Sequence, residues 1–314
     1  MDDDARRRVF LRRRLVAAGI AVVIVGLAIA GGMTAFGGDD GREETSAQAA
    51  PKPPQLPGGG RTIFPGRRVV AYYGAPQDDQ LGVLGIGSPR RAALKLERQA
   101  KPYARPGRPV LPAFELIAAI VTSEPGDGGD HSMRQDPATI QRYLRVARAH
   151  DMLLLLDIQP GYAPFLQEAQ ALERWLREPD VGLALDPEWS LRPPTLPAQE
   201  IGSTDAETVN DVSRYLANIV RRHDLPQKLL VVHRFTGDMI ENEHDLERDR
   251  GVALVVNVDG FGDRPNKISK YREFTRDLRR RFNGFKLFYH EDLNLMSPGQ
   301  VLRLRPEPDL VVYE

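Results

Sequence analysis

The feature that most constrains the fold of this chain is a regular alternation of two kinds of segment from Val69 onward. Short runs rich in leucine and β-branched residues, typical of buried parallel strands, alternate with longer amphipathic runs of helical period. The predicted strands are Val69–Tyr73, Leu111–Ile120, Met152–Ile158, Gly182–Asp186, Leu229–Phe235, Ala253–Val258, Lys286–Tyr289 and Leu310–Tyr313. The predicted helices are Arg90–Lys101, Pro137–Ala149, Pro164–Arg177, Asp205–His223, Asp238–Asp249 and Ile268–Phe282, with a short one at Gly299–Leu304.

This alternation implies parallel strand pairing with right-handed crossovers. Eight strands within residues 68–314 match the size of a (β/α)8 barrel, which typically takes about 250 residues. An open doubly wound sheet would produce the same alternation. A dinucleotide-binding open sheet would carry Gly-x-Gly-x-x-Gly after its first strand, which this chain lacks, and polar residues follow many of the strands. We therefore expect an α/β fold with a (β/α)8 TIM barrel.

The first 67 residues predict a membrane anchor and a tether. Residues 1–14 are a basic tail with six arginines in two triplets, and residues 15–38 are uncharged and long enough for one transmembrane helix. The positive-inside rule places the N-terminus in the cytoplasm and the barrel domain outside the plasma membrane. A cleaved signal peptide is the alternative, although its apolar core usually has about 7–15 residues. Residues 39–67 are rich in Gly, Pro and polar residues, which predicts a disordered linker.

Composition narrows the function classes. The chain has 43 basic and 43 acidic residues, so it lacks the overall positive field of a dedicated nucleic-acid binder. It has no cysteine, which excludes disulfides, thiol catalysis and thiolate metal sites. We expect a carbohydrate and the membrane as partners, and we expect neither a cofactor nor a metal.

The fourth predicted strand carries two acids at its end. In Gly182–Trp189, period-two alternation would place Gly182, Ala184, Asp186 and Glu188 on one face. At the C-terminal end of a barrel strand this face opens onto the usual active site. Neighbouring carboxylates raise each other's pKa, and Trp189 could desolvate one of them further. A protonated carboxyl is what a glycosidic leaving group needs, although a solvated loop start would also explain two acids.

The strand sequences bear a resemblance to a known enzyme family. Val69–Gly74 resembles the first strand of the chitinase-like glycoside hydrolases of family 18, and Leu153–Ile158 falls at that family's third strand. The family's fourth-strand motif D-x-x-D-x-D-x-E aligns with Val181–Glu188, where Asp186 and Glu188 match its last two acids. Its sixth-strand M-x-Y-D aligns with Val256–Asp259 and keeps the aspartate. The resemblance implies a TIM barrel with Glu188 as general acid.

A second glycosidase arrangement fits the same strands. Many retaining barrel glycosidases place the acid/base after strand four and a carboxylate nucleophile after strand seven, where this chain has Glu291. Carboxyls about 5–5.5 Å apart would give retention and about 6.5–9.5 Å inversion. Other strand-end residues are candidates for sugar contact, because aromatic faces and hydrogen-bonding groups suit carbohydrate clefts. These substrate-binding candidates are Tyr72, Tyr73, Asp157, Trp189, His233, Asp259, Tyr289 and His290.

Three functions remain open on the sequence. The first is a membrane-anchored, extracytoplasmic glycoside hydrolase-like enzyme that acts on a cell-envelope polysaccharide, with Glu188 as acid and Asp186 orienting it. The second is a non-catalytic carbohydrate-binding barrel, motivated by Val181 and Ala184 at motif positions that the family fills with acids. The third is a metal-dependent hydrolase in which His233 and His290 would meet with Asp259 and Asp292, a donor set that suits zinc.

Overall fold

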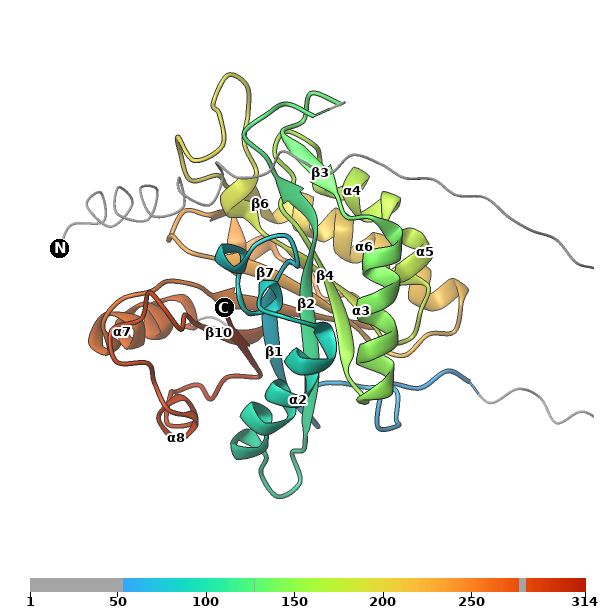
Figure 1. Cartoon of the computed structure of the whole chain (residues 1–314), viewed down its shortest axis with the longest axis vertical. Coiled ribbons are helices and arrows are strands. Elements are labelled where there is room, and N and C mark those ends of the chain that lie inside the picture. Colours follow the sequence, from blue (N-terminus) through green and yellow to red (C-terminus); the bar gives the residue numbers. More distant parts are fainter. Residues whose placement is uncertain (1–52, 127, 277–280) are drawn as a thin grey trace, which may run out of the picture.

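A closed parallel barrel forms the body of the protein. The computed structural model describes residues 53–126, 128–276 and 281–314 (Figure 1). Eight of its strands pair in parallel around the ring. They are β1 (Arg68–Gly74), β2 (Val110–Val121), β4 (Leu153–Ile158), β5 (Val181–Leu185), β7 (Lys228–Arg234), β9 (Val252–Val258), β10 (Phe282–Leu287) and β11 (Leu310–Tyr313). Because β1 pairs with β2 on one side and with β11 on the other, the sheet is closed, and the barrel prediction is confirmed.

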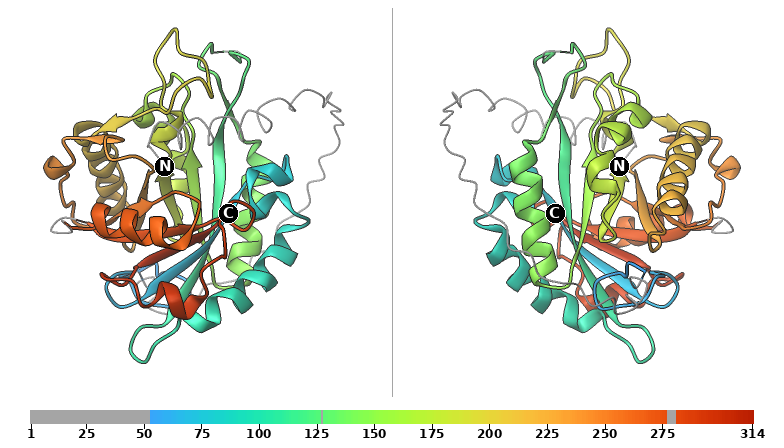
Figure 2. Two further views of the ribbon diagram at one scale, coloured as in Figure 1. Left: turned by 90° about the vertical axis from the view of Figure 1, so that its left-hand side faces the viewer. Right: turned by 90° about the vertical axis from the view of Figure 1, so that its right-hand side faces the viewer.

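Helices cover the outside of the barrel (Figure 2). They are α2 (Pro89–Ala100), α3 (Pro137–Ala149), α4 (Phe165–Ala171), α5 (Glu173–Leu176), α6 (Ala206–Arg222), α7 (Arg264–Phe274) and α8 (Pro298–Val301). Side-chain caps begin several of these helices: Ser88 accepts from the amide of Arg91, and Asp205 accepts from the amide of Thr208. Short strands complete the fold: β3 (Ser132–Arg134) runs antiparallel to β2, and β6 (Thr204–Asp205) pairs with β8 (Ile240–Glu241).

The crossovers depart from the expected pattern in two places. The helix predicted at Asp238–Asp249 is wrong, because β8 and a single 3₁₀ turn, Glu243–Asp245, occupy that segment. The helix predicted to begin at Ile268 begins at Arg264 instead, since Asp263 accepts a hydrogen bond from the amide of Asn266 and caps it. The following strand, β10, begins at Phe282, four residues before the expected start.

Side chains alternate between two separate apolar layers. Val69, Ala71 and other alternate strand residues fill the barrel, whereas Val70 and its counterparts pack between strands and helices. On β5, Ala184 faces inward and Leu183 and Leu185 face outward, as the alternation predicts. Polar side chains replace apolar ones near the C-terminal ends of the strands.

The N-terminal end of the barrel is closed by residues that were expected to be a linker. Leu56, Ile63 and Phe64 are buried in the inner apolar cluster, and the Phe64 ring lies 4.7 Å from that of Phe282. The Gln227 side chain accepts hydrogen bonds from the amides of Ile63 and Phe64. The packed domain therefore begins before Arg68.

The predicted membrane helix, residues 15–38, lies outside the described residues, as do the basic tail and the first part of the predicted linker. Among the residues that the structure does describe, no helix has the length and apolar character needed to cross a membrane.

Candidate functional site

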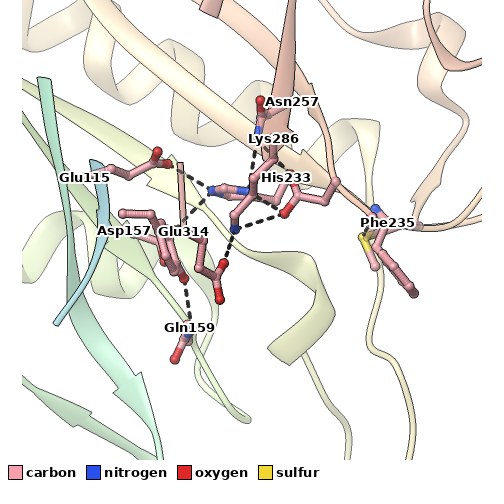
Figure 3. Close-up of polar contacts among 12 residues, drawn as sticks. Glu115, Asp157, Gln159, His233, Phe235, Asn257, Lys286 and Glu314 are labelled. Atoms are coloured by element: carbon pink, nitrogen blue, oxygen red, sulfur yellow. Dashed lines mark hydrogen bonds and ion pairs between the residues drawn. The ribbon is translucent and has the colours of Figure 1, made fainter. Parts of the chain in front are cut away.

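Every barrel strand contributes an inward polar side chain: Glu115 lies in the middle of β2, level with Tyr73, and the others lie near the C-terminal ends of their strands or in the residue after them. This polar ring consists of Tyr73, Glu115, Asp157, Asp186, His233, Asn257, Lys286 and Glu314, with Asp259 beside Asn257 (Figure 3). All are buried apart from Glu314, whose side chain is 13% exposed. The ring holds five carboxyl groups and two basic groups, so it concentrates negative charge within an apolar barrel.

His233 lies between two carboxylates (Figure 3). Its Nδ1 is 2.9 Å from Asp259 Oδ2, and its Nε2 is 2.9 Å from Glu115 Oε1. A neutral imidazole donates from only one nitrogen, so the protonated ring is the form that satisfies both contacts. Burial alone would lower the pKa of His233, but Asp259 and Glu115 together raise it well above its usual value. His233 is therefore an imidazolium near neutral pH.

Lys286 is the second cation of the ring. Its Nζ donates to Asp259 Oδ2 at 3.1 Å, pairs with Glu314 Oε2 at 2.9 Å, and lies 3.9 Å from the centre of the Tyr73 ring. Burial would raise the pKa of Asp259, but Lys286 and His233 lower it to about 2. Asp259 is therefore ionised and fixes the orientation of both cations. Gly284 makes room for this arrangement, because a Cβ there would overlap the Asn257 side chain.

Asp157 is held in the charge state opposite to that of Asp259. Tyr73 donates its hydroxyl proton to Asp157 Oδ2 at 2.9 Å and accepts from Gln159 Nε2 at 3.1 Å. Burial and the neighbouring Asp186 carboxylate raise the pKa of Asp157 to about 8. Asp157 therefore remains protonated at neutral pH, while Asp259 on the other side of His233 is ionised.

Asp157 and Glu115 each keep one oxygen without a hydrogen-bond partner among the described residues. These atoms are Asp157 Oδ1 and Glu115 Oε2, and both side chains are 0% exposed. Buried polar atoms are rarely left unpaired without a functional reason. Glu115, Asp157 and His233 each offer one potential ligand atom, all within 4.8 Å of one another, but a divalent cation would bind there only after His233 loses a proton.

The acids predicted on the fourth strand lie beside this group. Asp186 directly follows β5, is 3% exposed, and its charge acts on Asp157. The alternation ends there, because Pro187–Trp189 forms a 3₁₀ turn. Glu188 and Trp189 are both buried in that turn. The structure therefore places Asp186 beside Asp157, and Glu188 follows it in the buried turn.

Besides Glu188 and Trp189, four predicted site residues lie outside the ring. Tyr72 faces the outer apolar layer, and Tyr289 stacks on Tyr313 with ring centroids 5.4 Å apart. Tyr289, His290 and Glu291 lie in the turns after β10, where the first two are exposed and Glu291 is half-buried. Asp292 pairs with Lys267 at 2.8 Å, whereas the cation-binding geometry groups His233 with Glu115 and Asp157. The predicted zinc set with His290 is thus not assembled.

The loops at the C-terminal ends of β2, β4 and β5 are joined to one another above the ring. The amide of Tyr162 donates to the carbonyl of Asp130 at 2.7 Å, and the amide of Leu191 donates to that of Gly161 at 2.9 Å. Gly161 has a φ of +60°, and a Cβ there would overlap the Asp130 carbonyl. The loops after β2 and β5 project from the same end of the molecule (Figure 2).

The raised pKa of Asp157 predicts a pH-dependent stability. In the unfolded chain an aspartate loses its proton near about pH 3.9. Because the folded pKa is about 8, the contribution of Asp157 is fully present below about pH 4 and is lost as pH rises to 8. We expect the stability of the native chain relative to Asp157→Asn to fall across this window, by at most about 1.4 kcal/mol per pH unit. Urea unfolding of both proteins at pH 4.5, 6, 7 and 8.5 measures it, and a constant difference would contradict it.

Comparisons with known proteins do not assign the chain to a family. No protein-family model matches the sequence, and no curated protein sequence is significantly similar to it.

Proposed function

We propose that this protein is a barrel glycosidase acting on a cell-envelope polysaccharide, with Asp157 as general acid and Glu115 as its carboxylate partner. The observation that carries this proposal is the pairing of the two side chains. Asp157 is protonated at neutral pH, Glu115 receives a hydrogen bond from the His233 imidazolium through Oε1, and each carboxyl keeps one oxygen without a hydrogen-bond partner among the described residues. A protonated carboxyl beside a second carboxyl can serve as acid and nucleophile in one reaction.

Asp157 supplies the proton. Tyr73 occupies its Oδ2, so the proton resides on Oδ1, the oxygen without a partner among the described residues. In the proposed reaction, Oδ1 donates this proton to the glycosidic oxygen as the bond to the leaving sugar breaks. Asp186 maintains the proton on Asp157 between turnovers, because its negative charge opposes ionisation of Asp157.

Glu115 acts as the nucleophile in this proposal. The His233 imidazolium donates to its Oε1 and fixes the orientation of the side chain, and Oε2, which has no hydrogen-bond partner among the described residues, attacks the anomeric carbon. One oxygen of Glu115 and one oxygen of Asp157 lie within 4.8 Å of each other, so the two carboxyls are close enough for the direct attack of a retaining mechanism. The expected outcome is hydrolysis with retention at the anomeric carbon.

Two roles predicted from the sequence change in this proposal: Asp157 replaces Glu188 as the acid, and Glu115 replaces Glu291 as the nucleophile. Glu188 is buried one 3₁₀ turn beyond Asp186 and becomes a substrate-binding candidate together with Trp189. The polysaccharide reaches the ring by displacing the loops after β2, β4 and β5. A membrane anchor at residues 15–38, with the barrel outside the cell, would bring the site to an envelope substrate.

A covalent trap tests the proposal on the full chain. Active-site-directed 2-fluoro glycosides of several sugars should inactivate the protein, and mass spectrometry should locate the adduct on the peptide that contains Glu115. Glu115→Gln should abolish labelling. An adduct on Glu188 or Glu291 would favour the assignments made from sequence. Binding of polysaccharide without turnover would favour a carbohydrate-binding barrel, and loss of turnover with EDTA would favour metal-dependent hydrolysis at the same ring.

A further inference from the structure

A pocket lies on the outside of the barrel, away from the polar ring. It has a volume of about 460 Å³ and lies between α2, the turn after α2 and α8. Its lining residues are Tyr72, Lys95, Arg98, Gln99, Pro102 and Pro298. Tyr72 is the neighbour of Tyr73, so β1 contributes one tyrosine to the ring and the next to this outer pocket. The volume is in the range of small-molecule sites.

The pocket carries uncompensated positive charge. Lys95 and Arg98 are exposed on α2, three residues apart, and so project from one face of the helix. Neither has an acidic partner within the described part of the chain. The one acid of α2, Glu97, is bound to His150 at 2.7 Å instead. In a chain with equal numbers of acidic and basic residues, two unpaired neighbouring cations beside a pocket form a specific anion-attracting feature.

The other residues of the pocket wall offer hydroxyl, amide and apolar groups. Tyr289 donates to Gln99 Oε1 at 3.4 Å and also hydrogen-bonds to Tyr72. Burial raises the pKa of Tyr72, so its hydroxyl keeps its proton and can donate. The tyrosine ring and two prolines supply apolar surface. This combination can hold a ring or short chain against the wall while Lys95 and Arg98 bind its charge.

We propose that this pocket binds a phosphate ester of a small polar molecule, with Lys95 and Arg98 contacting the phosphate. A guanidinium and an ammonium together match the charge and the several oxygens of a phosphate monoester. The acidic polar ring cannot serve this purpose, since its excess of carboxyl groups repels anions. The inference does not depend on glycosidase activity, because the pocket lies outside the barrel.

Isothermal titration of the full chain in low salt tests this proposal, with glucose 6-phosphate, glucuronate and glucose as probes. Glucose 6-phosphate should bind at least tenfold more tightly than glucose, and glucuronate should fall between them. Lys95→Gln and Arg98→Gln should each weaken glucose 6-phosphate binding about tenfold, and 0.5 M NaCl should weaken it further. Arg90→Gln is the matched control, because it removes an exposed charge from the same helix without lining the pocket.

Two further results decide the matter. Binding of phosphatidylglycerol vesicles but not of glucose 6-phosphate, sensitive to the same two substitutions, would identify the phosphate as that of a lipid headgroup. Equal affinity for glucose and glucose 6-phosphate, absence of binding to every probe, or binding that Lys95→Gln and Arg98→Gln leave unchanged would overturn the proposal.

Discussion

Asp157→Asn is expected to abolish glycan cleavage while leaving the fold intact. The amide has the shape of the protonated carboxyl and can still accept the hydrogen bond from Tyr73, but it has no proton to give to the leaving oxygen. Loss of a general acid typically lowers the rate by about 10²–10⁴-fold. We therefore expect kcat/KM to fall by at least about 10²-fold at pH 6–7, measured on glycosides of the sugar whose 2-fluoro derivative labels the native protein.

The stability of Asp157→Asn should not fall with its activity. Above about pH 8 the native Asp157 is ionised in a site that already contains Asp186 and Glu115, whereas the amide stays neutral. The variant should therefore equal or exceed the native chain in free energy of unfolding at pH 8.5. Asp151→Asn is the matched control, because Asp151 is exposed at the other end of β4 and should change neither quantity. If the variant retained full kcat/KM, Asp157 would not be the acid.

The sequence predicts the barrel well because its pattern reports which layer each residue packs into. The predicted strand Met152–Ile158 is apolar on both faces except at Asp157, as a buried parallel strand requires, and the observed β4 begins one residue later, at Leu153. The α3 bounds agree, since Asp136 and Pro137 provide unambiguous start signals. The prediction failed at Asp238–Asp249, where helical composition is overridden by the short pairing of β6 with β8.

The site could be predicted only in part. Asp157, His233 and Asp259 end their strands and were found, but Glu115 and Lys286 were missed. Both residues lie within a strand. The only sequence feature that marks such a residue is a single charge among apolar neighbours, as Glu115 has in Ala113–Ile117. A buried charge requires a partner from another strand. The register that brings His233 to Glu115 depends on the stagger of the closed barrel, which no local pattern specifies.

Lys286→Met is expected to cause the largest loss of stability in this protein. The side chain is 1% exposed and serves Asp259 and Glu314 together, so its removal leaves a buried, ionised carboxylate without its principal counter-charge. Breaking one side of a buried ion pair typically costs about 3–5 kcal/mol. We expect a decrease of that size in the free energy of unfolding measured with urea at pH 7.

The double variant Lys286→Met/Asp259→Asn separates charge from packing. Asp259→Asn removes the carboxylate that Lys286 neutralises, so the double variant should regain a substantial part of the loss. We do not expect the free energy of unfolding to recover fully. The amide at position 259 lacks the charge that supports the His233 imidazolium at 2.9 Å, and the ion pair between Lys286 and Glu314 is still lost. The exposed Lys101→Met should stay within about 0.5 kcal/mol of the native chain. If the free energy of unfolding of Lys286→Met were within about 1 kcal/mol of the native value, the loss would be on the order of a surface substitution. Asp259 would then take up a proton when Lys286 is removed.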